Sequence, residues 1–165
     1  SYLLINFPDM DKCRYKYQRY VDIFKKIFGR DINRVIFMNN YINVKNKTYF
    51  YLLKNADCIL EPFPFGSLNS TYDAISVNQA IISYPSNYIS GRFTFGIYDK
   101  MNFKDTIVQD KEEYVETAIK YAKNTDNFKT NIQEYIDKYK NLVFREDKSV
   151  EDWNKMLVDL YNKHS

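Results

Sequence analysis

Residues 61–73 combine side chains and a spacing that could bind an anion. The apolar run 58–60 leads into residues 61–68, which read EPFPFGSL, and two prolines and a glycine predict a stiff, non-helical loop. A helix is then predicted to begin at Asn69, Ser70 and Thr71. The first N–H groups of a helix lack partners within it and lie at the positive end of its dipole, so they favour phosphate. The hydroxyls of Ser70 and Thr71 can add donors; the alternative is that Asn69 or Ser70 is an ordinary N-cap.

Asp73 lies one turn into the same predicted helix, four residues after Asn69 and therefore on the same face. A carboxylate accepts hydrogen bonds from both hydroxyls of a diol. Asp73 is thus suitably spaced to bind the ribose of a nucleotide whose pyrophosphate lies on the helix end. The alternative is a favourable interaction with the helix dipole, worth about 0.3–1 kcal/mol at an exposed first turn. The residues alone leave both interpretations open.

Other kinds of chemistry have few residues to use. His164, next to the last residue, is the only histidine, so Ser-His-Asp triads, Cys-His pairs and histidine metal sites lack a histidine in the body of the chain. Cys13 and Cys58 are far apart and form no CxxC motif, so we expect two free thiols. We therefore predict no metal site and no cofactor, and no catalytic residue can be named.

Composition predicts one folded domain spanning residues 1–165. Hydrophobic residues make up 45% of the chain and charged residues 27%, which is typical of globular proteins. The net charge is only +3 and is spread without a basic block, so no nucleic-acid partner is indicated. No stretch approaches the ~20 apolar residues that a membrane span needs, and we expect a cytoplasmic protein. Because the chain opens at Ser1 within an apolar run, we expect it to be a fragment of a longer protein.

The elements that must position residues 61–73 follow from hydrophobic periodicity. Short apolar runs predict strands at 2–5, 35–37, 58–60, 80–83 and 106–108. Helical spacing predicts helices at 11–28, 47–55, 69–78 and 90–101, the first with a C-cap at Gly29. Strands that are apolar on both faces and alternate with helices predict an α/β fold with a Rossmann-like, doubly wound parallel sheet. Ligands of such sheets bind outside the carboxyl ends of the strands, where residues 61–68 lie.

The last third of the chain predicts three helices without strands between them. Asp110 and Glu113 form a capping box before the first helix, and Ser149 with Asp152 repeats the signal before the third; the second spans 127–144. We expect these helices to form scaffold. The apolar positions expected to be buried are Val115, Ala118, Ile119 and Ala122 in the first helix, Ile132, Tyr135, Ile136, Tyr139 and Leu142 in the second, and Val150, Trp153, Leu157, Leu160 and Tyr161 in the third.

Residues 56–74 resemble a family. The run ADCILEPFPFG, which ends at Gly66, followed by Asn69 and Asp73, is similar to the donor-binding segment of the glycosyltransferases that include the protein O-linked N-acetylglucosamine transferases and the bacterial cytoplasmic adhesin N-glycosyltransferases. The similarity is closest to the latter group, which shares Pro-Phe-Pro-Phe-Gly with an Asn and an Asp at this spacing. Residues 90–92, which read SGR, resemble the Ser-Arg that opens the next helix in the O-linked group.

The resemblance implies the C-terminal, donor-binding lobe of a GT-B glycosyltransferase. It implies that Asn69 and Asp73 contact the diphosphate and ribose of a UDP-sugar, and that Lys47, and less directly Asn46 and Tyr49, touch the nucleotide. A lysine there would neutralise leaving-group charge, although Lys47 is equally well explained as a solvated surface lysine. The family carries Gly and Pro where residues 78–80 here read NQA. The N-terminal lobe, with the acceptor site and any catalytic base, would precede the chain.

We therefore expect an inverting, UDP-sugar-dependent glycosyltransferase that acts on Asn or Ser/Thr side chains of proteins, with this chain as its donor lobe and inactive alone. Its expected partners are a UDP-sugar, a protein or peptide acceptor and the missing lobe. One alternative is a non-catalytic Rossmann-like interaction module whose nucleotide site has decayed. Another is a single-stranded nucleic-acid binder that uses its 16 tyrosines, although the evenly mixed charges argue against it. The hexose, the acceptor atom and the biological target do not follow from these residues.

Overall fold

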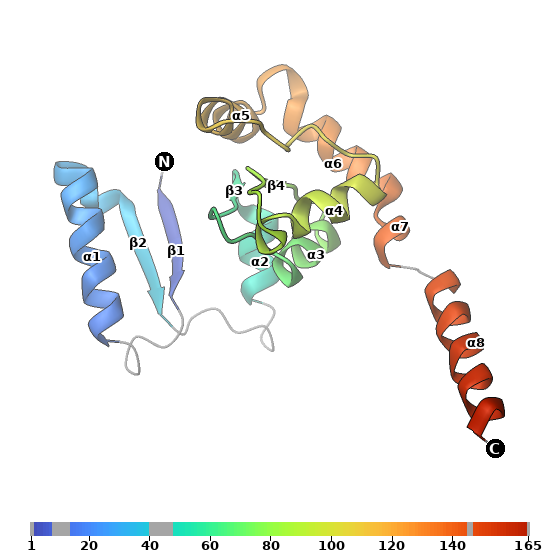
Figure 1. The fold of residues 1–165 in the computed structure, drawn as a ribbon. Helices are drawn as coiled ribbons and strands as arrows, with labels where there is room; N and C mark the ends of the chain where they lie inside the picture. The colour runs from blue at the N-terminus through green and yellow to red at the C-terminus, as the bar shows by residue number, and fades with distance from the viewer. Residues whose placement is uncertain (1, 8–13, 40–47, 145–146, 165) are drawn as a thin grey trace. The chain divides into compact units, whose positions relative to one another are not determined.

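The computed structural model describes residues 2–7, 14–39, 48–144 and 147–164. The chain divides into two compact units, Ser1–Leu52 and Leu53–Ser165, which are described separately below (Figure 1). This division does not test the expectation of a single domain, which stays a prediction.

The first unit is a β-α-β arrangement. It contains β1 (Leu3–Phe7), α1 (Arg14–Phe28), the 3-10 helix η1 (Gly29–Arg34) and β2 (Val35–Asn39). The two strands are parallel, with Leu3 opposite Val35. Helix α1 packs on β2 through two edge-to-face aromatic contacts, since the rings of Tyr17 and Phe24 each lie 5.6 Å from that of Phe37. Gly29 has a φ of 53°, as the predicted C-cap requires.

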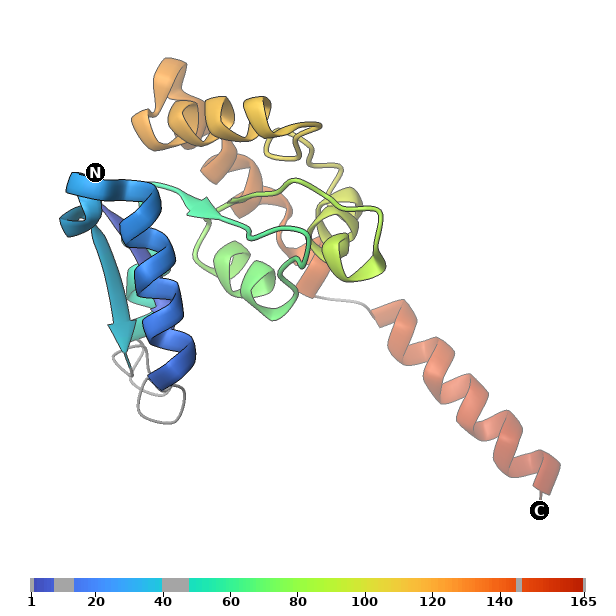
Figure 2. The same ribbon diagram turned by 60° about the vertical axis from the view of Figure 1, so that its left-hand side comes forward.

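Helix α2 (Thr48–Asn55) crosses the boundary between the units, and the second unit begins with a short parallel sheet. Strands β3 (Ile59–Leu60) and β4 (Ile81–Ile82) are parallel, and α3 (Asn69–Ser76) connects them. A parallel bridge between Ser83 and Ile107 extends this sheet by one position. After β4 come the 3-10 helix η3 (Ile89–Gly91) and α4 (Phe93–Lys100). In both views of Figures 1 and 2, α3 lies on one side of the β3–β4 pair, and α5 and α6 lie on the other.

The α/β class is confirmed, but a continuous doubly wound sheet is not. The described strands form two separate two-stranded parallel sheets, β1–β2 and β3–β4. The predicted strand 106–108 is reduced to the single bridge at Ile107, and the predicted helix 90–101 is divided into η3 and α4. The reason for the short β4 lies in the core: the N–H of Ala80 donates to the Tyr121 hydroxyl and that of Ile81 to the Tyr98 hydroxyl. Side chains thus take hydrogen bonds that a longer strand ladder would use.

The C-terminal third is helical, as predicted. It contains α5 (Lys111–Lys123), the 3-10 helix η4 (Thr125–Asn127), α6 (Phe128–Tyr139), α7 (Asn141–Phe144) and α8 (Asp147–His164). The capping signal of α5 is confirmed, because the Asp110 carboxylate accepts the Glu113 N–H at 2.8 Å. The Glu113 carboxylate in turn accepts the N–H of Gln109, one residue before the cap, at 2.6 Å. No helix in the described ranges is long and apolar enough to cross a membrane.

The predicted buried face of α5 is wrong. On α5, Val115 and Ile119 are about half exposed and Ala122 is exposed, whereas Tyr121 is fully buried with Ala118 beside it, so the buried face is rotated from the one predicted. Tyr121 determines which face of α5 is buried, because its ring is large and its hydroxyl has hydrogen-bond partners in the core.

The third helix also differs. Helix α8 begins at Asp147, two residues before the predicted cap Ser149, and every residue from 147 to 163 is exposed. The apolar stripe expected to be buried is therefore exposed, including Trp153 and Leu157.

In the second predicted helix, Ile132 and Ile136 are buried as expected, but the helix is divided at Lys140, and Val143 rather than Leu142 is buried.

The core of the second unit lies between the short sheet and the helices. It is formed by Ile75, Ala80, Ile82, Ile97, Tyr98, Met101, Phe103, Val108, Tyr121, Ile132, Ile136 and Val143. Burial raises the pKa of Tyr98, and it raises that of Tyr121 to about 12, so both hydroxyls stay protonated at neutral pH. Both hydroxyls accept hydrogen bonds from backbone N–H groups.

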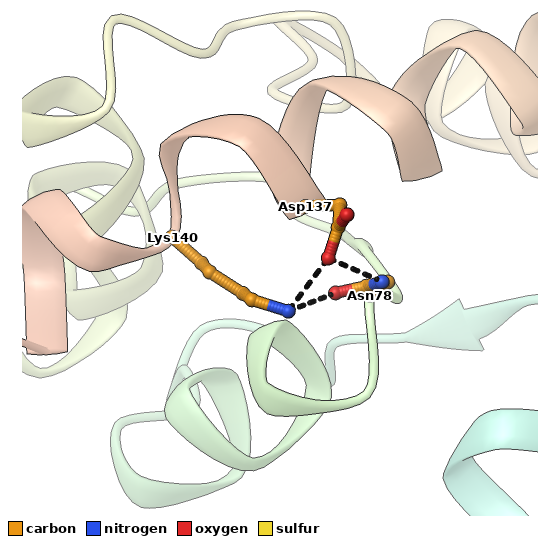
Figure 3. A network of polar contacts seen from close by, with 3 residues as sticks. All are labelled: Asn78, Asp137 and Lys140. Carbon is orange, nitrogen blue, oxygen red and sulfur yellow. Dashed lines mark hydrogen bonds and ion pairs between the residues drawn. The ribbon is translucent and has the colours of Figure 1, made fainter.

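Helix α3 ends in a Schellman turn whose left-handed residue is Asn78, with a φ of 60°. The N–H of Asn78 donates to the Ile75 carbonyl and that of Gln79 to the Ala74 carbonyl. The Asn78 side chain contacts Asp137 and Lys140 (Figure 3). Asparagine tolerates this conformation better than most residues, so it can stand where the similar family carries glycine.

Candidate functional site

The loop after β3 leads directly to the start of α3. The N–H of Glu61 donates to the Ile82 carbonyl at 3.1 Å, which continues the pairing of β3 with β4 by one residue. The loop then runs through a cis Phe63–Pro64 peptide to Leu68, the N-cap of α3. This loop therefore lies at the carboxyl ends of the parallel strands, the edge where ligands of α/β sheets bind.

The first turn of α3 is not capped by a side chain. The N-cap residue is Leu68, which makes no side-chain capping bond, so the interpretation of Asn69 or Ser70 as an ordinary N-cap is wrong. Asn69 and Ser70 are instead the first two helical residues, and both are exposed. The Leu68 carbonyl accepts the N–H groups of Thr71 and Tyr72. By helix geometry, the N–H groups of Asn69 and Ser70 have no acceptor within the helix, and the dipole there favours an anion.

The two predicted hydroxyl donors lie in different environments. Thr71 is fully buried, and its hydroxyl shares a 2.8 Å hydrogen bond with that of Thr94 on α4. The Ser70 side chain is exposed at the helix start. Of the two hydroxyls, only that of Ser70 faces the outside of the protein, whereas that of Thr71 belongs to the interior.

Asp73 is half-buried and lies one turn after Asn69 on the same face of α3. Its backbone carbonyl accepts the Ser76 hydroxyl at 2.7 Å. Lys47 and Asn46 lie outside the described residues, while Tyr49 lies in α2 with its ring 5.5 Å from that of Phe50. The structure thus brings Asn69, Ser70 and Asp73 together on one short helix, and their proposed ligand contacts stay predictions.

Gly66 lies where the loop packs closely against neighbouring residues. Its N–H donates to the Ser90 carbonyl at 2.9 Å, which ties the loop to η3. A Cβ at this position would lie 3.1 Å from Oε1 of Glu61 and 3.3 Å from Cα of Gly91. Gly91 is more restricted, because a Cβ there would overlap Ser86 and the Pro64 carbonyl. Both glycines therefore allow the two loops to approach each other.

Glu61 is a residue of this site that the sequence interpretation did not single out. It is 2% exposed, and three donors surround its carboxylate. Oε1 accepts the Ser67 N–H at 2.6 Å and the Thr94 hydroxyl at 2.5 Å, and Oε2 accepts the Ser83 hydroxyl. The available signal was a charged residue directly after a strand that the sequence predicts to be buried, since carboxylates are rarely buried without partners.

Two ionisable groups near this loop, the Tyr114 hydroxyl and the Cys58 thiol, are neutral at physiological pH. The Tyr114 hydroxyl donates to the Glu61 carbonyl at 2.8 Å, and burial raises its pKa. Burial also raises the pKa of the Cys58 thiol, which is free as predicted, to about 11; Cys13 lies outside the described residues. In the described part of the chain, no three His, Cys, Asp or Glu side chains converge as a metal site would require.

Comparisons with known proteins agree with the resemblance to protein glycosyltransferases. Over 77 residues the chain is 25% identical to the UDP-glucose:protein N-beta-glucosyltransferases of two Actinobacillus pleuropneumoniae strains, serotype 5b (strain L20) and serotype 7 (strain AP76). The match covers 46% of this chain and 12% of each relative. No protein-family model matches the chain.

The fold is similar to the solved structure of a mutant O-GlcNAc transferase from Thermobaculum terrenum. The TM-score is 0.66 at 13% sequence identity, and the match covers 86% of this chain and 26% of that chain. The suspected resemblance to protein glycosyltransferases is therefore confirmed in sequence and in fold, for a chain that spans a small part of the length of these proteins.

Proposed function

We propose that the chain is the donor-binding lobe of an inverting, UDP-sugar-dependent glycosyltransferase with a GT-B fold that acts on protein side chains. The observation that carries this proposal is the uncapped, exposed start of α3 at the carboxyl end of β3, with Asp73 one turn further on the same face. The names of the relatives support a sugar-nucleotide donor and a protein acceptor. The relatives matched in sequence are UDP-glucose:protein N-beta-glucosyltransferases, and the structural relative is an O-GlcNAc transferase.

The donor is proposed to bind along the first turn of α3. The diphosphate accepts the N–H groups of Asn69 and Ser70, helped by the dipole of the helix, and the Asp73 carboxylate accepts the ribose hydroxyls. The resemblance also implies that Lys47, which lies outside the described residues, adds positive charge near the diphosphate. In this arrangement the helix dipole and cationic side chains stabilise the charge of the diphosphate in place of a metal ion, so no metal is required.

The proposed reaction is a single displacement at the anomeric carbon. An Asn nitrogen or a Ser/Thr oxygen of the acceptor forms the new bond to this carbon, while the bond from the carbon to the β-phosphate oxygen breaks. UDP leaves with the bonding electrons, the acceptor loses its proton, and the configuration inverts. The donor lobe stabilises the negative charge on the leaving diphosphate. A second lobe supplies the acceptor site, so the chain alone is expected to bind UDP and to transfer no sugar; a cytoplasmic location goes with this function.

The interaction module with a decayed site is not favoured. It depended on the sequence at residues 78–80, where the similar family carries Gly and Pro. Asn78 adopts the left-handed conformation and Gln79 completes the Schellman turn, so α3 ends in regular geometry without either residue. The replacement therefore carries no sign of decay.

An NMR titration of the chain with UDP tests the proposal. We expect amide shifts concentrated in residues 66–73, and an affinity that falls about tenfold or more in Asp73→Ala because the ribose hydroxyls lose a charged acceptor, whereas Asn69→Ala keeps the backbone N–H and loses less. Asp99→Ala is the matched control, because Asp99 is an exposed carboxylate on α4 with a 3.9 Å ion pair to Lys104. Equal losses in all three variants, or shifts that avoid residues 66–73, would contradict the proposal.

A further inference from the structure

We propose that Glu61 is the positioning residue of the donor site: its buried carboxylate holds the 62–68 loop and the start of α3 in the geometry that binds the diphosphate. This inference rests on the proposed function and adds to it a residue that does not itself touch the donor. It starts from the three donors on one buried carboxylate, none of which comes from a cationic side chain.

The three contacts connect four elements of the second unit. Glu61 follows β3, Ser83 follows β4, Thr94 lies in the first turn of α4, and Ser67 precedes the N-cap of α3. Ser83 and Thr94 are 22 and 33 residues away from Glu61 in the chain. One carboxylate therefore fixes the end of the sheet, the start of α4 and the entrance to α3 relative to one another.

Ser67 is the contact that reaches the candidate site. Its N–H donates to Glu61 Oε1 at 2.6 Å, two residues before Asn69, whose N–H is proposed to bind the diphosphate. The position of Ser67 sets the direction in which the chain enters α3, and hence where the first N–H groups point. Gly66 beside it allows the approach, since a Cβ there would lie 3.1 Å from the same oxygen.

Thr94 links the Glu61 carboxylate to α3 itself through hydrogen bonds. Its hydroxyl donates to Glu61 Oε1 at 2.5 Å and shares a 2.8 Å hydrogen bond with the Thr71 hydroxyl, in the first turn of α3. Each hydroxyl has one proton, so the consistent chain runs from Thr71 to Thr94 to Glu61. All three polar neighbours of the Glu61 side chain donate hydrogen bonds to its oxygens.

The inference requires the hydrogen bonds of Glu61 and Thr94, and not only the space that their side chains fill. Thr94→Val and Thr94→Ser separate the two, because valine keeps the shape of threonine without the hydroxyl and serine keeps the hydroxyl with less volume. Likewise Glu61→Gln keeps an oxygen for Ser67 and can donate to the Ser83 hydroxyl, whereas Glu61→Leu leaves the Ser67 N–H without its acceptor.

Gln79→Met is the matched control. Gln79 is also a buried polar residue with several contacts, donating to the Lys54 carbonyl at 2.9 Å and accepting the Tyr121 hydroxyl at 2.9 Å. It precedes β4 and so lies at the opposite end of the sheet from Glu61. Its substitution is expected to lower stability without a change in the site.

The experiment measures UDP affinity of the chain by calorimetry, at a temperature where thermal unfolding shows each variant fully folded, together with the amide proton shift of Ser67. We expect Glu61→Leu and Thr94→Val to lose about tenfold or more in UDP affinity, and Glu61→Gln, Thr94→Ser and Gln79→Met to stay within about threefold of the parent chain. We expect the Ser67 amide proton to move upfield in Glu61→Leu, because a short bond to a carboxylate oxygen is lost.

The outcomes are distinct. If Thr94→Val binds UDP as the parent does while Thr94→Ser does not, packing and not the hydroxyl matters, and the inference is overturned. Equal UDP affinity in folded Glu61→Leu and the parent also overturns it, with the proposed function intact. If the parent chain binds no UDP, the proposed function fails, and the inference fails with it.

Discussion

The side-chain amide of Asn78 donates to the Asp137 carboxylate at 3.0 Å, and this joins the turn after α3 to α6, 59 residues further along the chain (Figure 3). Lys140 completes the group, because its ammonium donates to Asn78 Oδ1 at 3.0 Å and to Asp137 Oδ1 at 2.7 Å. Asn78 thus contributes twice: its backbone adopts the left-handed conformation, and its side chain anchors the end of the helix that carries the candidate site.

The backbone contribution predicts a specific order of stabilities. Asn78→Ala should lower the free energy of unfolding by about 1–2 kcal/mol, because a Cβ without a local hydrogen bond is costly in the left-handed region. Asn78→Gly should lose less, because glycine adopts this conformation freely and only the side-chain contacts disappear. Urea unfolding measures both. An alanine variant as stable as the glycine variant would contradict this explanation of the turn.

The side-chain contribution predicts a pH dependence. Hydrogen bonds from Lys140 and Asn78, together with the charge of Lys140, lower the pKa of Asp137 below its ordinary 3.8. A lowered folded-state pKa stabilises the fold above pH 3.8, and this stabilisation is lost as the pH falls through the lowered value. The difference in unfolding free energy between the parent and Asp137→Asn should therefore shrink from pH 6 to pH 3 and below. Asp99→Asn serves as a surface control, and a difference that is constant with pH would contradict the prediction.

Periodicity and caps could be predicted from the sequence because they are local. Asp110 and Glu113 are three residues apart and form the cap that their spacing predicts, and the helical signal of 69–78 corresponds to α3. The start of α3 was also found from the loop and the small polar residues that precede Asp73. Each of these signals lies within a few residues, and tertiary packing does not overrule them here.

The contacts around Glu61 could not be predicted in this way. Its partners Ser83 and Thr94 come from elements that only the fold brings together, and periodicity carries no information about such pairs. The same reason explains the wrong face of α5, where Tyr121 is buried through contacts with residues 79 and 80. On α8 the apolar period is present, yet each residue from 147 to 163 is exposed, because an amphipathic pattern predicts a buried face only where another element covers it.

The capping box offers a second stability test. Asp110→Ala should destabilise the chain by about 1 kcal/mol, because the Glu113 N–H loses its 2.8 Å bond to the cap. Asp110→Asn should lose only a few tenths, since asparagine is an equally good N-cap residue. Thermal unfolding of the two variants checks this, and equal losses would show that charge near the helix end, rather than the hydrogen bond, gives the stability.

Burial of Cys58 predicts slow alkylation. Its pKa of about 11 against an ordinary 9.0 leaves roughly 100-fold less thiolate at pH 8, and the thiolate is the nucleophile. In a Cys13→Ser variant, which leaves Cys58 as the only cysteine, iodoacetamide should react at least that much more slowly than with free cysteine. Unfolding the variant in urea should restore the ordinary rate. A fast reaction of the folded variant would contradict the partly buried position of this thiol.

The central claim is that the exposed start of α3 holds the diphosphate of a uridine nucleotide. Calorimetry of the chain with UDP, UMP, GDP and ADP at one fixed salt concentration tests it most directly. The account predicts that UDP binds most tightly, that UMP binds at least about tenfold more weakly because it lacks the second phosphate, and that Asp73→Ala lowers the affinity for UDP about tenfold or more because the ribose hydroxyls lose their acceptor. Equal affinity for UDP and UMP, or no binding of any of the four nucleotides, would contradict it.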